Sequence, residues 1–166
     1  RNTFERLLPK QPALDGVCAE LRTIAPSSAH LCLYVGVKQS ASELGLDGTN
    51  LWIHPTPDHD ANLQRFAADP DGPFPVLFIS FPSAKDPDFQ RRFPGRTTIE
   101  VLTVANYDWF LKWEGSRWHR RGEDYNAFKQ RLATRLQAEL ERHVPAIAGK
   151  IDHAELSTPL STRHFM

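Results

Sequence analysis

The longest unbroken helical pattern in this chain covers residues 123–143. Apolar side chains recur there every three or four positions, so they would form one stripe on a helix of 3.6 residues per turn. Gly122 and Pro145 mark the two ends of the pattern. The pattern predicts an amphipathic helix about 30 Å long that packs on a flat apolar surface. The stripe consists of Tyr125, Phe128, Leu132, Leu136, Leu140 and Val144.

Three earlier stretches, residues 30–37, 75–81 and 97–105, have the composition of strands and predict the sheet beneath this helix. In the first stretch an aliphatic set alternates with a mixed set, so the two sets point to opposite faces of the sheet. We expect the aliphatic set to face the long helix. The aliphatic set is Leu31, Leu33, Val35 and Val37, and the mixed set is His30, Cys32, Tyr34 and Gly36.

The remaining segments are shorter. Helical spacing occurs in residues 14–24, where Pro26 ends it, and one or two helical turns are expected in residues 62–68. A short aromatic helix is expected from Tyr107 to Trp113, starting at Asn106 or Asp108. Short strands are expected at residues 51–54 and 151–156, and a proline-rich loop at residues 82–95.

Near the end of the sequence, Thr158 and Pro159 have the pattern of a helix start, and residues 160–166 continue it for about two turns. Helices and strands therefore follow one another in no regular alternation. This order predicts an α+β fold, with a mixed, largely antiparallel sheet of about four to six strands and helices packed on one face.

The composition excludes several classes of function. The charges of twenty basic and twenty acidic residues cancel in the 166-residue chain, which argues against nucleic acid as the main partner. Cys18 and Cys32 have neither metal-site spacing nor the density of a disulfide scaffold, so both are expected to be reduced core residues. We expect a cytoplasmic location, with a membrane-peripheral location of the full-length protein left open. No apolar run approaches the length of a transmembrane segment.

Two clusters have residue types that carry chemistry. Residues 54–60 contain histidines and aspartates, which can bind zinc or iron, but two prolines there favour an exposed polar loop and no metal. Trp109, Trp113, Trp118 and the basic residues 119–121 have the interleaving of single-strand nucleic-acid binders. Anchoring of the tryptophans in the core is the favoured interpretation. No phosphate-binding glycine motif and no nucleophile motif is present.

Five segments together resemble the phytoene desaturase, carotenoid isomerase and retinol saturase family of flavoproteins. They are residues 1–9 (RNTFERLLP), residues 26–36 (PSSAHLCLYVG), residues 93–99 (FPGRTTI), the pair Tyr125 and Lys129, and residues 157–162 (STPLST). The order of the segments is that of the middle to C-terminal part of these proteins, and the resemblance extends over nearly the whole chain. The sequence also begins without a methionine, and we expect it to be a fragment.

The resemblance implies a role. In that family such a segment is the substrate domain, an α+β insert with a sheet floor, and the reaction is desaturation, saturation or isomerisation of a polyene at the flavin. Residues 1–166 would then form one substrate domain that is inactive alone, with the FAD domain of the same full-length chain outside it. No catalytic residue is carried over, because the chemistry belongs mainly to the flavin.

The mixed set of the first strand would face the substrate, so Tyr34, Cys32 and His30 are the candidate substrate-binding residues, and no cofactor is expected in this chain itself. The implied partners are the FAD domain and an apolar isoprenoid. Self-association of the fragment through the face that bears Tyr34 is also expected, because the apolar strands offer a second face without cover. The alternative is a stand-alone module that binds a lipid-like ligand or a protein.

Overall fold

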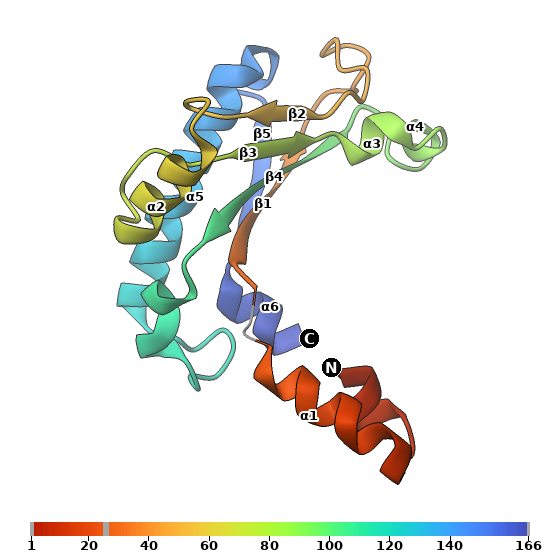
Figure 1. Ribbon diagram of the computed structural model, residues 1–166. Helices are drawn as coiled ribbons and strands as arrows, with labels where there is room; N and C mark the ends of the chain where they lie inside the picture. Colours follow the sequence, from red (N-terminus) through yellow and green to blue (C-terminus); the bar gives the residue numbers. More distant parts are fainter. Residues whose placement is uncertain (1, 25–26, 166) are drawn as a thin grey trace.

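The computed structural model describes residues 2–24 and 27–165 and contains one open five-stranded sheet in the order β2-β3-β4-β1-β5 (Figure 1). Every strand pair is antiparallel. With helices packed beside the sheet, the α+β class predicted from the sequence is confirmed. The strands are β1 (Ala29–Val37), β2 (Leu51–Ile53), β3 (Leu77–Ser80), β4 (Thr97–Ala105) and β5 (Ile151–Ser157).

The α-helices agree with the sequence pattern except in the stretch 82–95, and the short helices η1 (Thr3–Leu7), η2 (Pro12–Leu14) and η4 (Pro145–Ile147) were not predicted. The stretch 82–95, predicted to be a loop, contains two single-turn helices, because Pro82 occupies a first helical position, where its missing N–H costs no hydrogen bond. The predicted break at Pro26 and the last residue, Met166, lie outside the described residues. The α-helices are α1 (Asp15–Thr23), α2 (His59–Ala68), α3 (Pro82–Lys85), α4 (Phe89–Arg92), α5 (Glu123–His143) and α6 (Pro159–Phe165).

Four short helices of other types complete the chain. The aromatic segment predicted as a helix is the 3-10 helix η3 (Tyr107–Trp113), and the Asn106 side chain accepts a hydrogen bond from the Asp108 backbone N–H at its start. The other three are η1 (Thr3–Leu7), η2 (Pro12–Leu14) and η4 (Pro145–Ile147). The N-terminal helices η1, η2 and α1 bury no residue.

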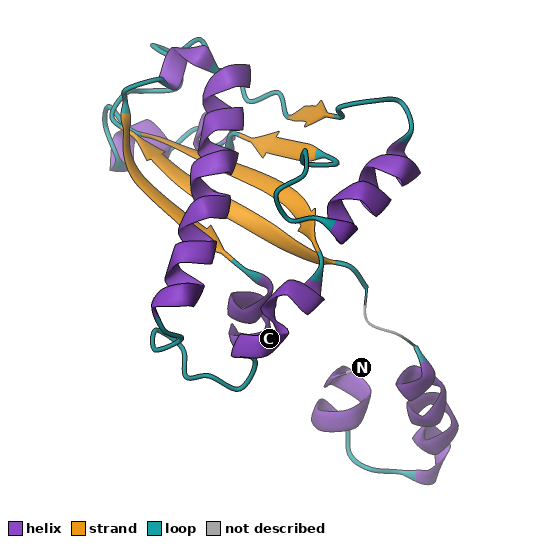
Figure 2. Cartoon of the chain, turned by 90° about the vertical axis from the view of Figure 1, so that its left-hand side faces the viewer, coloured by secondary structure: helices purple, strands orange, loops and turns teal. Residues whose placement is uncertain are grey.

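The long helix α5 crosses one face of the sheet (Figure 2). Its bounds match the predicted ones, with Glu123 and Asp124 in the first turn and Arg142 in the last, where these charges oppose the nearby ends of the helix dipole. Leu132, Leu136 and Leu140 are fully buried in its stripe. They share one core with Leu31, Leu33, Val35 and Val37 of β1, so the predicted assignment of the aliphatic face is confirmed.

The start of α5 is bonded to the start of α6. The hydroxyl groups of Tyr125 and Thr158 lie 2.8 Å apart, and both side chains are buried. Thr158 directly precedes α6, as the sequence pattern predicted; its hydroxyl bonds to Tyr125, and its carbonyl oxygen accepts from the backbone N–H groups of Ser161 and Thr162. This bond therefore fixes the last strand and helix against α5.

Replacing Leu136 by alanine should lower the free energy of unfolding by about 2–5 kcal/mol, because the cavity lies where α5 meets the sheet and cannot collapse easily. Denaturant midpoints measure the effect. Leu111, which is 47% exposed on η3, supplies the control. If Leu111→Ala destabilised the protein more than Leu136→Ala, the helix would not bury the stripe described above.

Tyr125→Phe should cost about 1–3 kcal/mol, because it leaves the buried Thr158 hydroxyl without its partner. Thr158→Val should have a similar cost, and the double variant should cost less than the sum of the two single variants. Urea unfolding of the four proteins measures the coupling. Additive losses would show that the two hydroxyls do not stabilise each other.

Candidate functional site

The face of the sheet opposite α5 is open at its centre. In Figure 1 the helices α2 and α5 lie to the left of the strands, while α3 and α4 project at the upper right and no helix crosses the middle of that side. The strand register brings one residue from each strand into a row across this face. We call it the apolar row: Trp52, Phe78, Leu102, Cys32 and Ser157.

The apolar row is exposed at one end and covered at the other. Trp52, on the edge strand β2, is 67% exposed and lies with its ring centroid 4.6 Å from that of Phe78. Phe78 and Leu102 are half-buried, whereas Cys32 is buried. Together these side chains provide an apolar strip that lies across the strands.

A second, polar row runs beside the apolar row. It contains Ser80, Glu100, Tyr34 and Glu155, from four neighbouring strands. Since residues two positions apart on a strand point to the same face, this row lies roughly 7 Å from the apolar row. The open face is therefore banded, with one apolar band and one band of hydroxyl and carboxylate groups.

A cleft of about 560 Å³ opens where these rows reach β5. Tyr34 and Ser157 come from the open face, Tyr125, Asn126 and Lys129 come from α5, and α6 and the loop before α5 close the rest. Arg121 and Lys129 contribute two cations against the single carboxylate of Glu155, whose oxygen lies 3.6 Å from the Lys129 amine. The cleft is thus polar, aromatic and weakly cationic.

The loop before α5 gives the cleft an aromatic wall. Trp118 packs against His119, His164 and Phe165, with ring centroids 4.0–5.0 Å apart. His119 has a φ of 61°, a value that few residues other than glycine adopt, and it is the only described non-glycine residue with a positive φ. Such strained positions concentrate at functional sites. The sequence indicated a core position for Trp118, but it is 37% exposed and lines the cleft.

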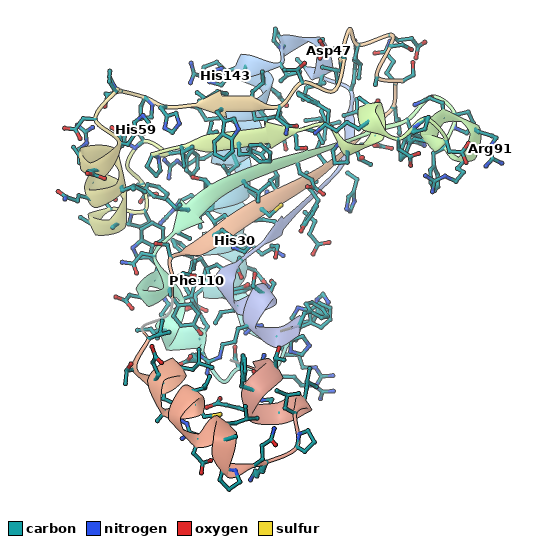
Figure 3. All side chains as sticks on the ribbon, turned by 45° about the vertical axis from the view of Figure 1, so that its right-hand side comes forward. His30, Asp47, His59, Arg91, Phe110 and His143 are labelled. Atoms are coloured by element: carbon teal, nitrogen blue, oxygen red, sulfur yellow. The ribbon has the colours of Figure 1, made fainter. Side chains whose placement is uncertain are left out.

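The three residues predicted to bind substrate all lie on the open face, in different surroundings. Tyr34 is 45% exposed and lines the cleft, Cys32 is buried in the apolar row, and His30 is exposed at the strand end (Figure 3). The structure brings Tyr34 and Cys32 together, whereas His30 lies farther along β1 opposite Val104. Lys129, Trp118 and Ser157 belong to the cleft although the sequence pattern did not single them out as site residues.

Tyr34 and Cys32 both keep their protons at neutral pH. Burial is the largest cause that raises the pKa of the Cys32 thiol above its usual value of 9.0. Contact with that thiol raises the pKa of Tyr34 to about 12, and the charge of Glu100 acts in the same direction. The phenol of Tyr34 therefore remains a neutral hydrogen-bonding group at the mouth of the cleft.

The other two clusters noted in the sequence have structural explanations. The rings of His54 and His59 stack in parallel, 4.1 Å apart, and no group of three or more potential ligands gathers around a metal position in the described part of the chain. Trp113 is buried and Trp109 contacts Phe66 edge to face, which confirms core anchoring for these two tryptophans.

The described residues do not fit FAD. A dinucleotide cradle needs a strand-turn-helix unit between parallel strands, with its helix N-terminus at the pyrophosphate. In residues 2–24 and 27–165 the sheet is antiparallel throughout and no such unit occurs. No helix in the same residues is long and apolar enough to cross a bilayer.

Fold and site together define an α+β sheet domain with one face covered by a long helix and the other open beside a polar cleft. Sequence comparison then identifies the relatives. The chain is 31% identical to human (Homo sapiens) all-trans-retinol 13,14-reductase and 29% identical to the Macaca fascicularis enzyme of the same name, each over 99% of this chain. These proteins belong to the family that the sequence motifs resemble, so the resemblance is confirmed. No protein-family model matches.

The chain spans about 28% of the length of the curated relatives it matches. It is thus homologous to one segment of these reductases. A Danio rerio relative named inactive all-trans-retinol 13,14-reductase is 30% identical over 96% of this chain. Since a relative that is named inactive matches at nearly the same identity as the human reductase, likeness over this segment does not report on catalysis.

The raised pKa of Cys32 predicts a pH dependence of stability. Its folded-state pKa lies above the unfolded value, so the stabilisation it contributes is complete below about pH 9 and is lost as pH rises through the folded-state value. The free energy of unfolding, measured in urea at a series of pH values, should therefore fall at alkaline pH. Cys32→Ala should reduce this fall and Cys18→Ala should not. An equal fall in all three proteins would contradict the assignment.

Proposed function

We propose that this chain is the substrate-binding part of a larger FAD-dependent oxidoreductase that acts on an apolar isoprenoid polyene. The observation that carries the proposal is the open sheet face, on which the exposed Trp52 and the half-buried Phe78 and Leu102 form an apolar strip. The relatives support it, since their printed name describes reduction of all-trans-retinol, an elongated polyene. Reduction, desaturation and isomerisation remain the candidate reactions.

The chemistry of the open face suits such a substrate. Apolar surface removed from water contributes roughly 25 cal/mol per Å², so a polyene lying on the apolar strip gains binding free energy without needing hydrogen bonds. The strip is also held in place by a rigid sheet, with α5 packed behind it, and binding therefore requires little reorganisation. These residues bind and orient the substrate and keep water from one of its sides.

FAD would supply the redox chemistry when bound, and the chain described here has no cradle for its pyrophosphate. The proposal therefore assigns the flavin to a part of the longer protein outside residues 1–166. This chain contributes only the surface against which the substrate is held. We therefore expect residues 1–166 to be inactive without the part of the protein that binds the flavin.

Binding of all-trans-retinol tests the proposal. Titration of the purified chain should quench tryptophan fluorescence to saturation, and Leu102→Glu should weaken binding at least tenfold, because the carboxylate must lose water against the apolar strip. Leu111→Glu is the matched control, since Leu111 is an exposed leucine outside the open face. Titration with FAD should leave flavin fluorescence unchanged.

Equal retinol affinity in Leu102→Glu and the unaltered chain would show that the open face is not the binding surface. Saturable quenching of flavin fluorescence would contradict the division between substrate and flavin parts. Absence of any retinol binding would refute the proposed function as a whole.

A further inference from the structure

The apolar part of the open face is longer across the strands than along them. Across the strands the accessible part of the apolar row extends from Trp52 to Leu102, a distance of roughly 10 Å for two strand spacings of about 4.8 Å, and the next member, Cys32, is buried. Along the strands the apolar band is narrow, because Glu100 and Tyr34 follow within one side-chain repeat on one side. A rod-shaped apolar molecule that lies across the strands therefore contacts Trp52, Phe78 and Leu102 in turn and avoids the row that contains Glu100.

The two ends of the apolar row are chemically different. The β2 end is the exposed indole of Trp52 at the edge of the sheet. The β5 end is Ser157, which is both the last member of the row and part of the wall of the cleft. A molecule with one end at Trp52 that extends past Leu102 must cross the buried Cys32 beside Tyr34 before its other end reaches the cleft wall at Ser157.

The cleft provides hydrogen-bond donors for that end. Lys129 is 28% exposed at its side chain and its partner Glu155 is 57% exposed, so the Lys129 amine remains reachable. The Tyr34 phenol is protonated across the neutral range, and contact with Cys32, which raises its pKa to about 12, keeps it protonated at alkaline pH as well. Ser157 and Ser161 add two hydroxyl groups. These groups match an acceptor such as a hydroxyl or carboxylate oxygen.

We infer that the ligand of the open face is an elongated apolar molecule with one polar end, that its body lies across the strands along the apolar row, and that its polar end lies in the cleft beside Lys129 and Tyr34. This inference rests on the proposed function and goes beyond it by assigning a direction to the ligand and a chemistry to its end. Lys129 and Tyr34 act here as specificity-determining residues.

Affinity for three probes tests the end-group chemistry. All-trans-retinoic acid, all-trans-retinol and the corresponding hydrocarbon without a polar end should bind this chain in that order of decreasing affinity. Lys129→Gln should weaken the acid about fivefold, the size expected for one solvent-exposed ion pair, and leave the hydrocarbon unchanged. Arg131→Gln is the control, because Arg131 lies on the same helix but pairs with Asp71.

Short-range quenching tests the direction. A long-chain fatty acid brominated near its carboxyl end should quench Trp118, which lines the cleft, and one brominated near its methyl end should quench Trp52. Trp118→Phe should remove the quenching by the first probe and Trp52→Phe that by the second. Trp109 and Trp113, which pack against the core, should respond to neither.

The outcomes separate the inference from the proposed function. Binding that is abolished by Leu102→Glu but has equal strength for the three probes, or equal bromine quenching from both positions, would overturn the inference and leave the proposed function in place. Binding that does not respond to Leu102→Glu would overturn both.

Discussion

The structure depends on the packing of one helix stripe against one face of β1 and β4. Leu132, Leu136 and Leu140 have no exposed surface, and neither have Leu33 and Val101 beneath them. Because side chains on a strand alternate between faces, burial of the aliphatic set on one side commits the intervening residues to the other side. A slip of one residue in β1 would bury Tyr34 and expose Leu33. The same constraint that builds the core therefore also presents the candidate site.

Two side-chain contacts join α5 to β5 and to the start of α6, which lie about 30 residues further along the chain. Tyr125 bonds to Thr158, and Lys129 on the next turn of α5 pairs with Glu155. The residues at which α5 meets the end of the chain are thus among those that carried the resemblance to the flavoprotein family. They hold β5 and α6 against α5, and the cleft lies between these elements. Residues that carried the family resemblance are therefore also the framework of the cleft.

Periodic patterns allowed correct prediction of the elements that bury a regular face. The bounds of α5 and β4 match the sequence pattern because each has a long unbroken period. The α3–α4 region was missed because prolines indicate breaks and single-turn helices leave no period to detect. The cleft could not be predicted, since its walls come from β1, β5, α5, α6 and a loop, and only strand register and helix packing bring them together. Trp118 differs from Trp113 in exposure although both lie in the same aromatic segment.

The banding of the open face resolves a conflict between solubility and ligand binding. A sheet face that is apolar throughout would associate with any apolar surface, and proteins usually break such faces with charged residues. Here Glu100 on β4 and Glu155 on β5 interrupt the face along their strands, while the register places the apolar row side by side across the strands. A flat apolar surface of another protein would also cover the charged row, and the carboxylates there would lose their hydration. A narrow molecule avoids this cost by lying within one row. The geometry therefore favours a thin ligand over a flat protein surface.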